Sequence, residues 1–295
     1  MPQAGPRPTR NVGSVDAAEH FTDLAPVWDQ QAEAMDAAMG GHASAAVAAL
    51  APRPGERVAD LGCGAGLSAV ELGRLVGPDG WVAAVDIAAP MVAAAQRRLS
   101  AAGVRGTAVT ADVASADLVE LAGAGVPFDA AHSRFGLMFF ADPKRAFTNV
   151  FRALRPGGRL AASVWQHLAG NPWMMLTTAT AVQVLGIDRP PLPQPGQPGP
   201  FSLADRDGTA ALLRDAGFSD VHIEPVDAPF VFEGDGRAAA ARVLSAGPLG
   251  AAFLAADHSR RDDVVAAVVG ALEHHRGPSG FEVPAASWCL TARHP

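Results

Sequence analysis

The chain has 295 residues, a length that allows one large domain or two small ones. It is 49% hydrophobic and 18% charged, which is enough apolar material for a sizeable core and excludes a globally disordered chain. Lys and Arg number 23 against 30 Asp and Glu, and the formal net charge of -7 disfavours nucleic acid as a partner. Two cysteines, Cys63 and Cys289, are too few for a disulfide framework or a cysteine-rich zinc site.

The N-terminal residues and the longest uncharged stretch indicate whether the protein is secreted or inserted into a membrane. Residues 1–15 contain prolines and arginines but no apolar run, so we expect a disordered tail and no secretory signal. Residues 160–187 carry no formal charge, but Gln, His, Gly, Asn and Pro interrupt them, whereas a transmembrane helix needs ~20 continuous apolar residues. We therefore expect a soluble, cytoplasmic protein.

In chain order, two helices are predicted first, at residues 17–39 and 43–50. Short apolar strands then alternate with helices. The strands are predicted at residues 57–61, 81–85, 107–110, 128–133 and 159–165. The helices between them are predicted at residues 67–76, 90–102, 113–121 and 143–154. Strands separated by helices imply right-handed βαβ units and a parallel sheet.

The last third of the chain departs from this alternation. Residues 189–200 are too rich in proline for a helix or a central strand. A helix is predicted at residues 205–216, and mostly helical structure at 236–275. Strands are predicted at residues 218–226 and 282–292, which brings the predicted strands to seven.

The first predicted strand leads through a glycine turn into a helix. Gly62, Gly64 and Gly66 allow positive φ and the close approach of a ligand, and the helix N-terminus offers unpaired N–H groups. Asp86 ends the next strand, where an acid can accept hydrogen bonds from ribose hydroxyls. A tight turn without ligand and a dinucleotide site remain alternatives, because Gly64, Gly66 and Ala69 also meet the relaxed dinucleotide pattern.

The turn resembles the first motif of the class I S-adenosylmethionine-dependent methyltransferases, an acid followed by glycines at every second position. Asp60, Gly62, Gly64 and Gly66 fit that motif. Further motifs of the family follow in order, namely Asp86 with Ile87, the turn 111–113, the strand 128–134 and the turn 154–158. The resemblance covers residues 17–226, and the segment 133–140 is similar to the bacterial branch of ubiquinone/menaquinone (type 11) methyltransferases.

The resemblance implies a Rossmann-like α/β fold with a seven-stranded, mostly parallel sheet, an antiparallel last strand, helices on both faces and helical lid insertions. It implies S-adenosylmethionine as cofactor and S-adenosylhomocysteine as product. Asp86 would bind the ribose, Asp112 the adenine amino group, and Ser133 to Phe135 the methionine side. The implied cofactor residues are Asp60, Gly62, Cys63, Gly64, Gly66, Asp86, Ile87, Met91, Asp112, Val113, Ser133, Arg134 and Phe135.

Segments outside the core sheet are predicted to cover the acceptor. We expect N-terminal lid helices at residues 16–50 and a methyltransferase domain at 51–295, with lid insertions at 171–204 and 230–280. Ligands of open α/β sheets bind beyond the carboxyl ends of the strands, so apolar residues there are expected to face the acceptor. The predicted lid residues are Phe21, Trp28, Met138, Trp165 and Trp173, for which ordinary core packing is the alternative.

Methyl transfer requires that acceptor, methyl group and leaving sulfur be aligned and that water be excluded. A general base is needed only where the acceptor loses a proton as it attacks. His167 is the first candidate, because it follows a strand and titrates near neutrality, and His20 and His132 come next. A structural histidine is the alternative for each. No metal is expected, since His274 and His275 lack further ligands at a suitable spacing.

We therefore predict methyl transfer to oxygen, nitrogen or carbon of a small, largely apolar or aromatic metabolite, in bacterial secondary metabolism. A quinone-biosynthesis-type C-methyltransferase is one alternative, and a cofactor-binding protein without turnover is another. A nucleic-acid methyltransferase is disfavoured by the acidic charge and by Asn171-Pro172-Trp173, which has one proline and follows the fifth strand. The expected partner is a small-molecule acceptor, with no nucleic acid or membrane, and the expected state is a monomer or homodimer.

Overall fold

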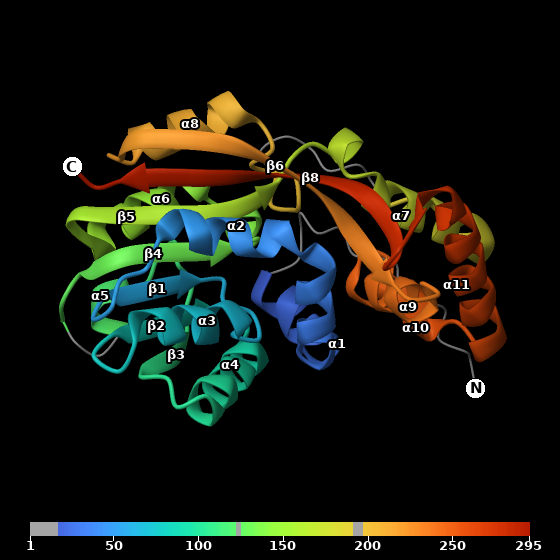
Figure 1. Cartoon of the computed structure of the whole chain (residues 1–295), viewed down its shortest axis with the longest axis horizontal. Coiled ribbons are helices and arrows are strands. Elements are labelled where there is room, and N and C mark those ends of the chain that lie inside the picture. Colours follow the sequence, from blue (N-terminus) through green and yellow to red (C-terminus); the bar gives the residue numbers. More distant parts are fainter. Residues whose placement is uncertain (1–16, 122–124, 191–196) are drawn as a thin grey trace, which may run out of the picture.

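The computed structural model describes residues 17–121, 125–190 and 197–295 (Figure 1). Within these ranges one eight-stranded sheet has the order β3-β2-β1-β4-β5-β8-β6, with β7 paired to β8. The strands are β1 Arg57–Leu61, β2 Trp81–Asp86, β3 Gly106–Thr110, β4 Phe128–Arg134, β5 Leu154–Trp165, β6 Ser219–Glu233, β7 Arg276–Gly277 and β8 Gly280–Arg293. Strands β1 to β5 pair in parallel, and β8 is antiparallel to β5 and β6. The predicted mostly parallel sheet with an antiparallel last strand is thereby confirmed.

The strand count and the lengths of the last strands differ from the sequence prediction. The eighth strand is β7, which has two residues and pairs only with the start of β8. Strand β6 has 15 residues and continues past Pro229 to Glu233, whereas the prediction ended it at residue 226. Proline removes a ladder donor, but β6 lies at the edge of the sheet, where proline is tolerated.

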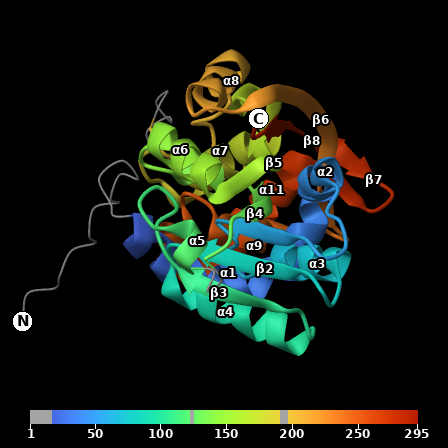
Figure 2. The same cartoon turned by 90° about the vertical axis from the view of Figure 1, so that its left-hand side faces the viewer.

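Helices cover both faces of the sheet, as predicted (Figures 1 and 2). One face carries α2 Gly41–Leu50, α3 Leu67–Val76 and α4 Ala89–Ala101. The other carries α5 Leu118–Leu121, α6 Pro143–Ala153 and α8 Arg206–Asp215. Helix α5 is shorter than the predicted helix at 113–121. Three short 3-10 turns complete these connections, η1 Leu137–Phe139, η2 Leu168–Gly170 and η3 Glu273–His275.

A second lobe is built on the far half of the β6/β8 ribbon (Figure 1). Pairing of β5 with β8 stops at Trp165 and Ser287, whereas β6 and β8 stay paired as far as Glu233 and Gly280. The helices of this lobe are α7 Pro172–Leu185, α9 Arg237–Ala246, α10 Gly250–Ala255 and α11 His258–Leu272. Helix α1, Ala17–Met39, lies between the lobes and contacts α4, β6 and α9. No helix in the described ranges is both long and apolar enough to cross a membrane.

The two lobes share one apolar core. The same cluster of buried side chains contains Phe147 and Leu160 beside the sheet and Phe230, Phe281 and Leu272 in the second lobe. The opposite face of the sheet has its own cluster, in which alanines and valines of the strands pack against α2, α3 and α4. Buried side chains in the described parts of the segments predicted as insertions therefore belong to the main core.

Candidate functional site

The carboxyl end of β1 opens into a turn whose three glycines have positive φ. The φ angle is 65° at Gly62, 51° at Gly64 and 88° at Gly66, a region that favours glycine. A Cβ at Gly62 would lie 2.9 Å from the Gly136 Cα, and one at Gly66 would lie 2.6 Å from the Ala95 Cα. A Cβ at Gly64 would meet no described atom within 4 Å. The middle of the turn therefore borders open space that a ligand can enter.

Asp86 ends β2 beside this turn and binds it. The Gly64 N–H donates to its Oδ2 at 2.9 Å, and the Ala88 N–H donates to its Oδ1 at 2.9 Å. Burial raises the pKa of the Asp86 carboxyl, and the backbone N–H donors oppose that rise. Each oxygen keeps a further lone pair, so the carboxylate fits a pair of ribose hydroxyl donors.

Asp60 and Cys63 are both buried beneath the turn. The Ser68 hydroxyl donates to Asp60 Oδ2 at 2.7 Å, and His132 Nδ1 lies 2.8 Å from Asp60 Oδ1. Since these contacts occupy the fully buried Asp60 carboxylate, we assign it no direct cofactor contact. Burial also raises the pKa of the Cys63 thiol, which fits a packing residue.

The turn after β3 carries the predicted adenine contact. Asp112 is exposed, and its carboxylate accepts hydrogen bonds from Ala114 N at 2.9 Å and Ser115 Oγ at 2.7 Å. Val113 is buried, and its carbonyl accepts a hydrogen bond from Asn149 of α6 at 2.7 Å. The backbone of this turn is thus fixed to α6, while the Asp112 carboxylate stays accessible.

The carboxyl ends of β4 and β5 are joined through Phe135. This residue has a φ of 57°, which is unusual for a bulky side chain and persists only where the surroundings impose it. Its N–H donates to the Ser163 carbonyl at 2.9 Å. Its ring stacks on Trp165, with centroids 4.2 Å apart and planes 15° apart. Near the end of β4, the Ser133 hydroxyl donates to the Leu61 carbonyl of β1 at 2.7 Å.

Aromatic contacts continue from this pair into the second lobe. Trp165 contacts Trp173 with ring centroids 5.5 Å apart, and Trp173 stacks on Phe230 at 4.1 Å. The Met138 sulfur lies 3.2 Å from the Trp165 backbone nitrogen. The structure therefore brings three predicted lid residues together, Met138, Trp165 and Trp173.

Helix α1 lies across the glycine turn and is held there by charged side chains. Asp29 accepts from Arg98 at 2.5 Å, and the same guanidinium donates to the Ala65 carbonyl at 3.1 Å. Asp36 forms an ion pair with Arg134 at the end of β4. The apolar contacts between α1 and the turn involve Ala25, Ala65, Ala88, Met91 and Ala94, flanked by Phe21, Trp28 and Ala32. Ile87, beside Ala88, is half-buried.

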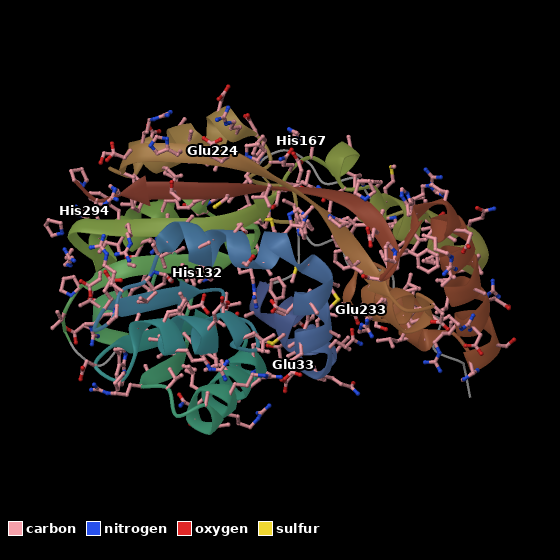
Figure 3. The ribbon with its side chains drawn as sticks, viewed as in Figure 1. Glu33, His132, His167, Glu224, Glu233 and His294 are labelled. Carbon is pink, nitrogen blue, oxygen red and sulfur yellow. The ribbon has the colours of Figure 1, made fainter. Side chains whose placement is uncertain are left out.

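The three predicted base candidates are not brought together. His167 is exposed on the loop after β5 and lies at the outer edge of the molecule (Figure 3). His132 is fully buried within the sheet, on the strand beside Asp60 (Figure 3). The His20 side chain lies outside the described part, as does the predicted tail. We therefore assign no proton-transfer role to His167.

One buried histidine was missed by the sequence prediction. His42 is fully buried at the start of α2, where its Nδ1 lies 2.8 Å from the Ser287 Oγ. Its Nε2 lies 2.9 Å from the Ala228 carbonyl, and its ring meets Trp165 edge-on at 5.3 Å. Burial lowers the pKa of His42. The available signal was a single imidazole in a helix otherwise made of small and apolar residues.

Comparison with known proteins points to the same class of protein as the sequence motifs, the methyltransferases. Residues 58–158 match the family model described as a methyltransferase domain. An arsenite methyltransferase of Halobacterium salinarum is 29% identical over 69% of this chain, but the match spans only 47% of that relative. A demethylmenaquinone methyltransferase of Renibacterium salmoninarum is 26% identical over 70% of this chain and 85% of its own length.

Solved structures share the fold. The [4+2]-cyclase SpnF is 19% identical, covers 98% of each chain and has a TM-score of 0.53. At that identity the likeness concerns the fold alone, and one fold hosts many functions. The likeness to methyltransferases rests instead on the ordered motifs and on the match of residues 58–158. Residues 58–158 are thus similar to a methyltransferase domain, and the motifs within them resemble those of the class I S-adenosylmethionine-dependent methyltransferases.

Proposed function

We propose that the protein transfers a methyl group from S-adenosylmethionine to a small, largely apolar or aromatic acceptor. The observation that carries this proposal is the open space at Gly64 beside the Asp86 carboxylate. The bound cofactor supplies an electrophilic methyl carbon on a positively charged sulfur. By family resemblance, Asp86 holds the ribose, Asp112 the adenine amino group, and the backbone around Gly62 the amino-acid end.

The acceptor is proposed to lie beyond the carboxyl ends of β4 and β5. Support comes from the half-buried Phe135 ring, which is apolar and is held at that edge by stacking on the buried Trp165 ring. Helices α1 and α2 and the segments 171–204 and 230–280 are proposed to cover the acceptor and exclude water. An amine or an enamine-like carbon needs no general base, whereas an alcohol or a phenol does.

The quinone-type alternative is supported by the similarity to the demethylmenaquinone methyltransferase. A panel of naphthoquinols, phenols and amines, scored by release of S-adenosylhomocysteine, separates the acceptor classes and the O-, N- and C-products. Cofactor binding without release of S-adenosylhomocysteine across that panel supports the non-catalytic alternative. Failure of the folded protein to bind S-adenosylmethionine by isothermal titration contradicts the proposal as a whole.

A matched pair of glycine substitutions tests whether the glycine turn 62–66 binds the cofactor. Gly64 and Gly77 both have positive φ, and neither has a described atom within 4 Å of an added Cβ. Gly64→Ala and Gly77→Ala are each expected to cost about 1–3 kcal/mol of stability, because both residues have a positive φ that alanine disfavours. Only Gly64→Ala is expected to weaken S-adenosylmethionine binding, by at least about tenfold, as its methyl group enters the cofactor space. Equal affinities of the two variants, measured by titration calorimetry, contradict cofactor binding at this turn.

Cofactor affinity is expected to depend on pH through Asp86. Its carboxyl has a raised pKa, and the ionised form is the one that accepts two hydroxyl donors. Affinity is therefore full above the raised pKa and falls as the pH drops through it, sooner than for an ordinary aspartate. The stability of the free protein responds to this group in the opposite direction, because protonated Asp86 favours the fold. Titrations between about pH 4 and pH 7 should show the fall in affinity, and Asp86→Asn should remove it.

A further inference from the structure

A buried polar cluster lies beneath the cofactor turn and is not used by the proposed reaction. It consists of Asp60, Ser68 and His132, which are respectively 0%, 2% and 0% exposed. We propose that His132 is a positioning residue that, by binding Asp60, fixes the glycine turn in its cofactor-binding conformation. This inference rests on the proposed function, because cofactor affinity is one of its readouts.

The Asp60 carboxylate joins the two ends of the turn. Asp60 precedes the glycines at the end of β1, and Ser68 follows them in the first turn of α3. The hydrogen bond of 2.7 Å from Ser68 Oγ to Asp60 Oδ2 therefore closes the segment 62–66 at its base. A buried carboxylate is costly unless donors satisfy both of its oxygens. The second oxygen depends on His132.

His132 supplies that donor from the neighbouring strand. It pairs in register with Asp60 across β4 and β1, and its Nδ1 lies 2.8 Å from Asp60 Oδ1. The next residue, Ser133, donates to the carbonyl of Leu61 at 2.7 Å. Consecutive residues of β4 thus bind consecutive residues of β1 immediately before Gly62. Displacement of Asp60 would shift the start of the turn.

The second ring nitrogen of His132 makes no hydrogen bond to a described residue that would complicate a test of this role. Within the described residues, the buried Nε2 of His132 has no hydrogen-bond partner. The Nδ1 contact with Asp60 is accordingly the polar interaction that a substitution must preserve. An asparagine amide can place a donor near the Nδ1 position, whereas a leucine fills a similar volume without any donor. The two substitutions separate hydrogen bonding from packing.

The test compares His132→Leu with His132→Asn in the full-length protein. We expect His132→Leu to weaken S-adenosylmethionine binding at least about tenfold, and His132→Asn to recover most of that loss. Leu213→Ala, which truncates a buried residue of α8, is the control for lost stability and is expected to bind the cofactor as the wild type does. Asp60→Asn combined with His132→Leu should weaken binding no further than the stronger single change, because both act through one hydrogen bond.

A second readout does not involve the cofactor. The N–H groups of Gly62 and Cys63 donate to the Val85 carbonyl, and that of Gly64 donates to Asp86, so all three are protected from exchange in the ordered turn. His132→Leu should speed their hydrogen exchange in the free protein, and His132→Asn should not. Wild-type affinity together with unchanged exchange in folded His132→Leu overturns the inference, as does His132→Asn behaving like His132→Leu. A wild-type protein that does not bind S-adenosylmethionine defeats the proposed function, and the exchange comparison then still decides the role of His132.

Discussion

Replacing Asp86 with alanine is expected to weaken S-adenosylmethionine binding by about 100-fold or more. Two hydrogen bonds from ribose hydroxyls to a carboxylate would be lost, each worth about 1.5–3 kcal/mol. A loss of ~3 kcal/mol corresponds to a factor of ~100 in the dissociation constant. Titration calorimetry of the purified variant measures this directly. The effect is expected to exceed that of any other single carboxylate in the site, because Asp86 adjoins the open space at Gly64.

The free protein should also respond to this substitution. Without the carboxylate, the N–H groups of Gly64 and Ala88 lose their acceptor, at a cost of about 1–3 kcal/mol. Part of this cost is offset, since the raised pKa shows that the ionised carboxyl is itself disfavoured by burial. Asp112→Ala is the control, because Asp112 is exposed, and it should weaken binding far less. An Asp86→Ala variant with wild-type affinity would contradict the ribose assignment.

Replacing Trp165 with alanine should give the largest loss of stability among the site residues. The side chain is 5% exposed, stacks on Phe135 and contacts His42 and Trp173. Truncation of a buried tryptophan costs about 3–5 kcal/mol, because surrounding side chains collapse only partly into the cavity. Urea unfolding measures the change in the free energy of unfolding. Methyl transfer should fall with it, because Phe135 loses the ring that supports it.

Two controls separate stability from function here. Trp165→Phe retains a ring against Phe135 and should keep most of the stability and turnover. Trp81→Ala removes a half-buried tryptophan at the start of β2, at the amino ends of the parallel strands, and should lower stability without changing acceptor turnover. Loss of turnover in Trp81→Ala equal to that in Trp165→Ala would argue against an aromatic acceptor surface.

The glycine turn and the place of Asp86 beside it were predictable from the sequence because their signals are local. A short apolar strand, alternate glycines and an acid at the end of the next strand fix the turn and its partner within one βαβ unit. The structure adds that Gly62 and Gly66 are required for packing against Gly136 and Ala95, whereas Gly64 borders open space. That division depends on atoms distant in sequence, so spacing alone could not reveal it.

The remaining features depend on long-range contacts. The Asp60–His132 pair spans 72 residues, and the His42–Ser287 pair spans 245 residues, so no sequence window contains both partners. The left-handed conformation of Phe135 was unpredictable because propensity disfavours it for a bulky residue. The prediction ended β6 at residue 226, before Pro229. Proline is tolerated in a strand only at a sheet edge, and the sequence does not state which strand lies there.

The continuous β6/β8 ribbon has a mechanical consequence. Its ladder runs in unbroken register from His222 and Thr291 to Glu233 and Gly280, through the junction between the lobes. Bending the molecule at that junction would require breaking several backbone hydrogen bonds together. Helix α1, by contrast, is held by side-chain ion pairs to α4 and to the end of β4, and by small apolar contacts to the turn. We therefore expect the β6/β8 ribbon to resist bending between the lobes. Of the elements around the turn, α1 is expected to move most easily.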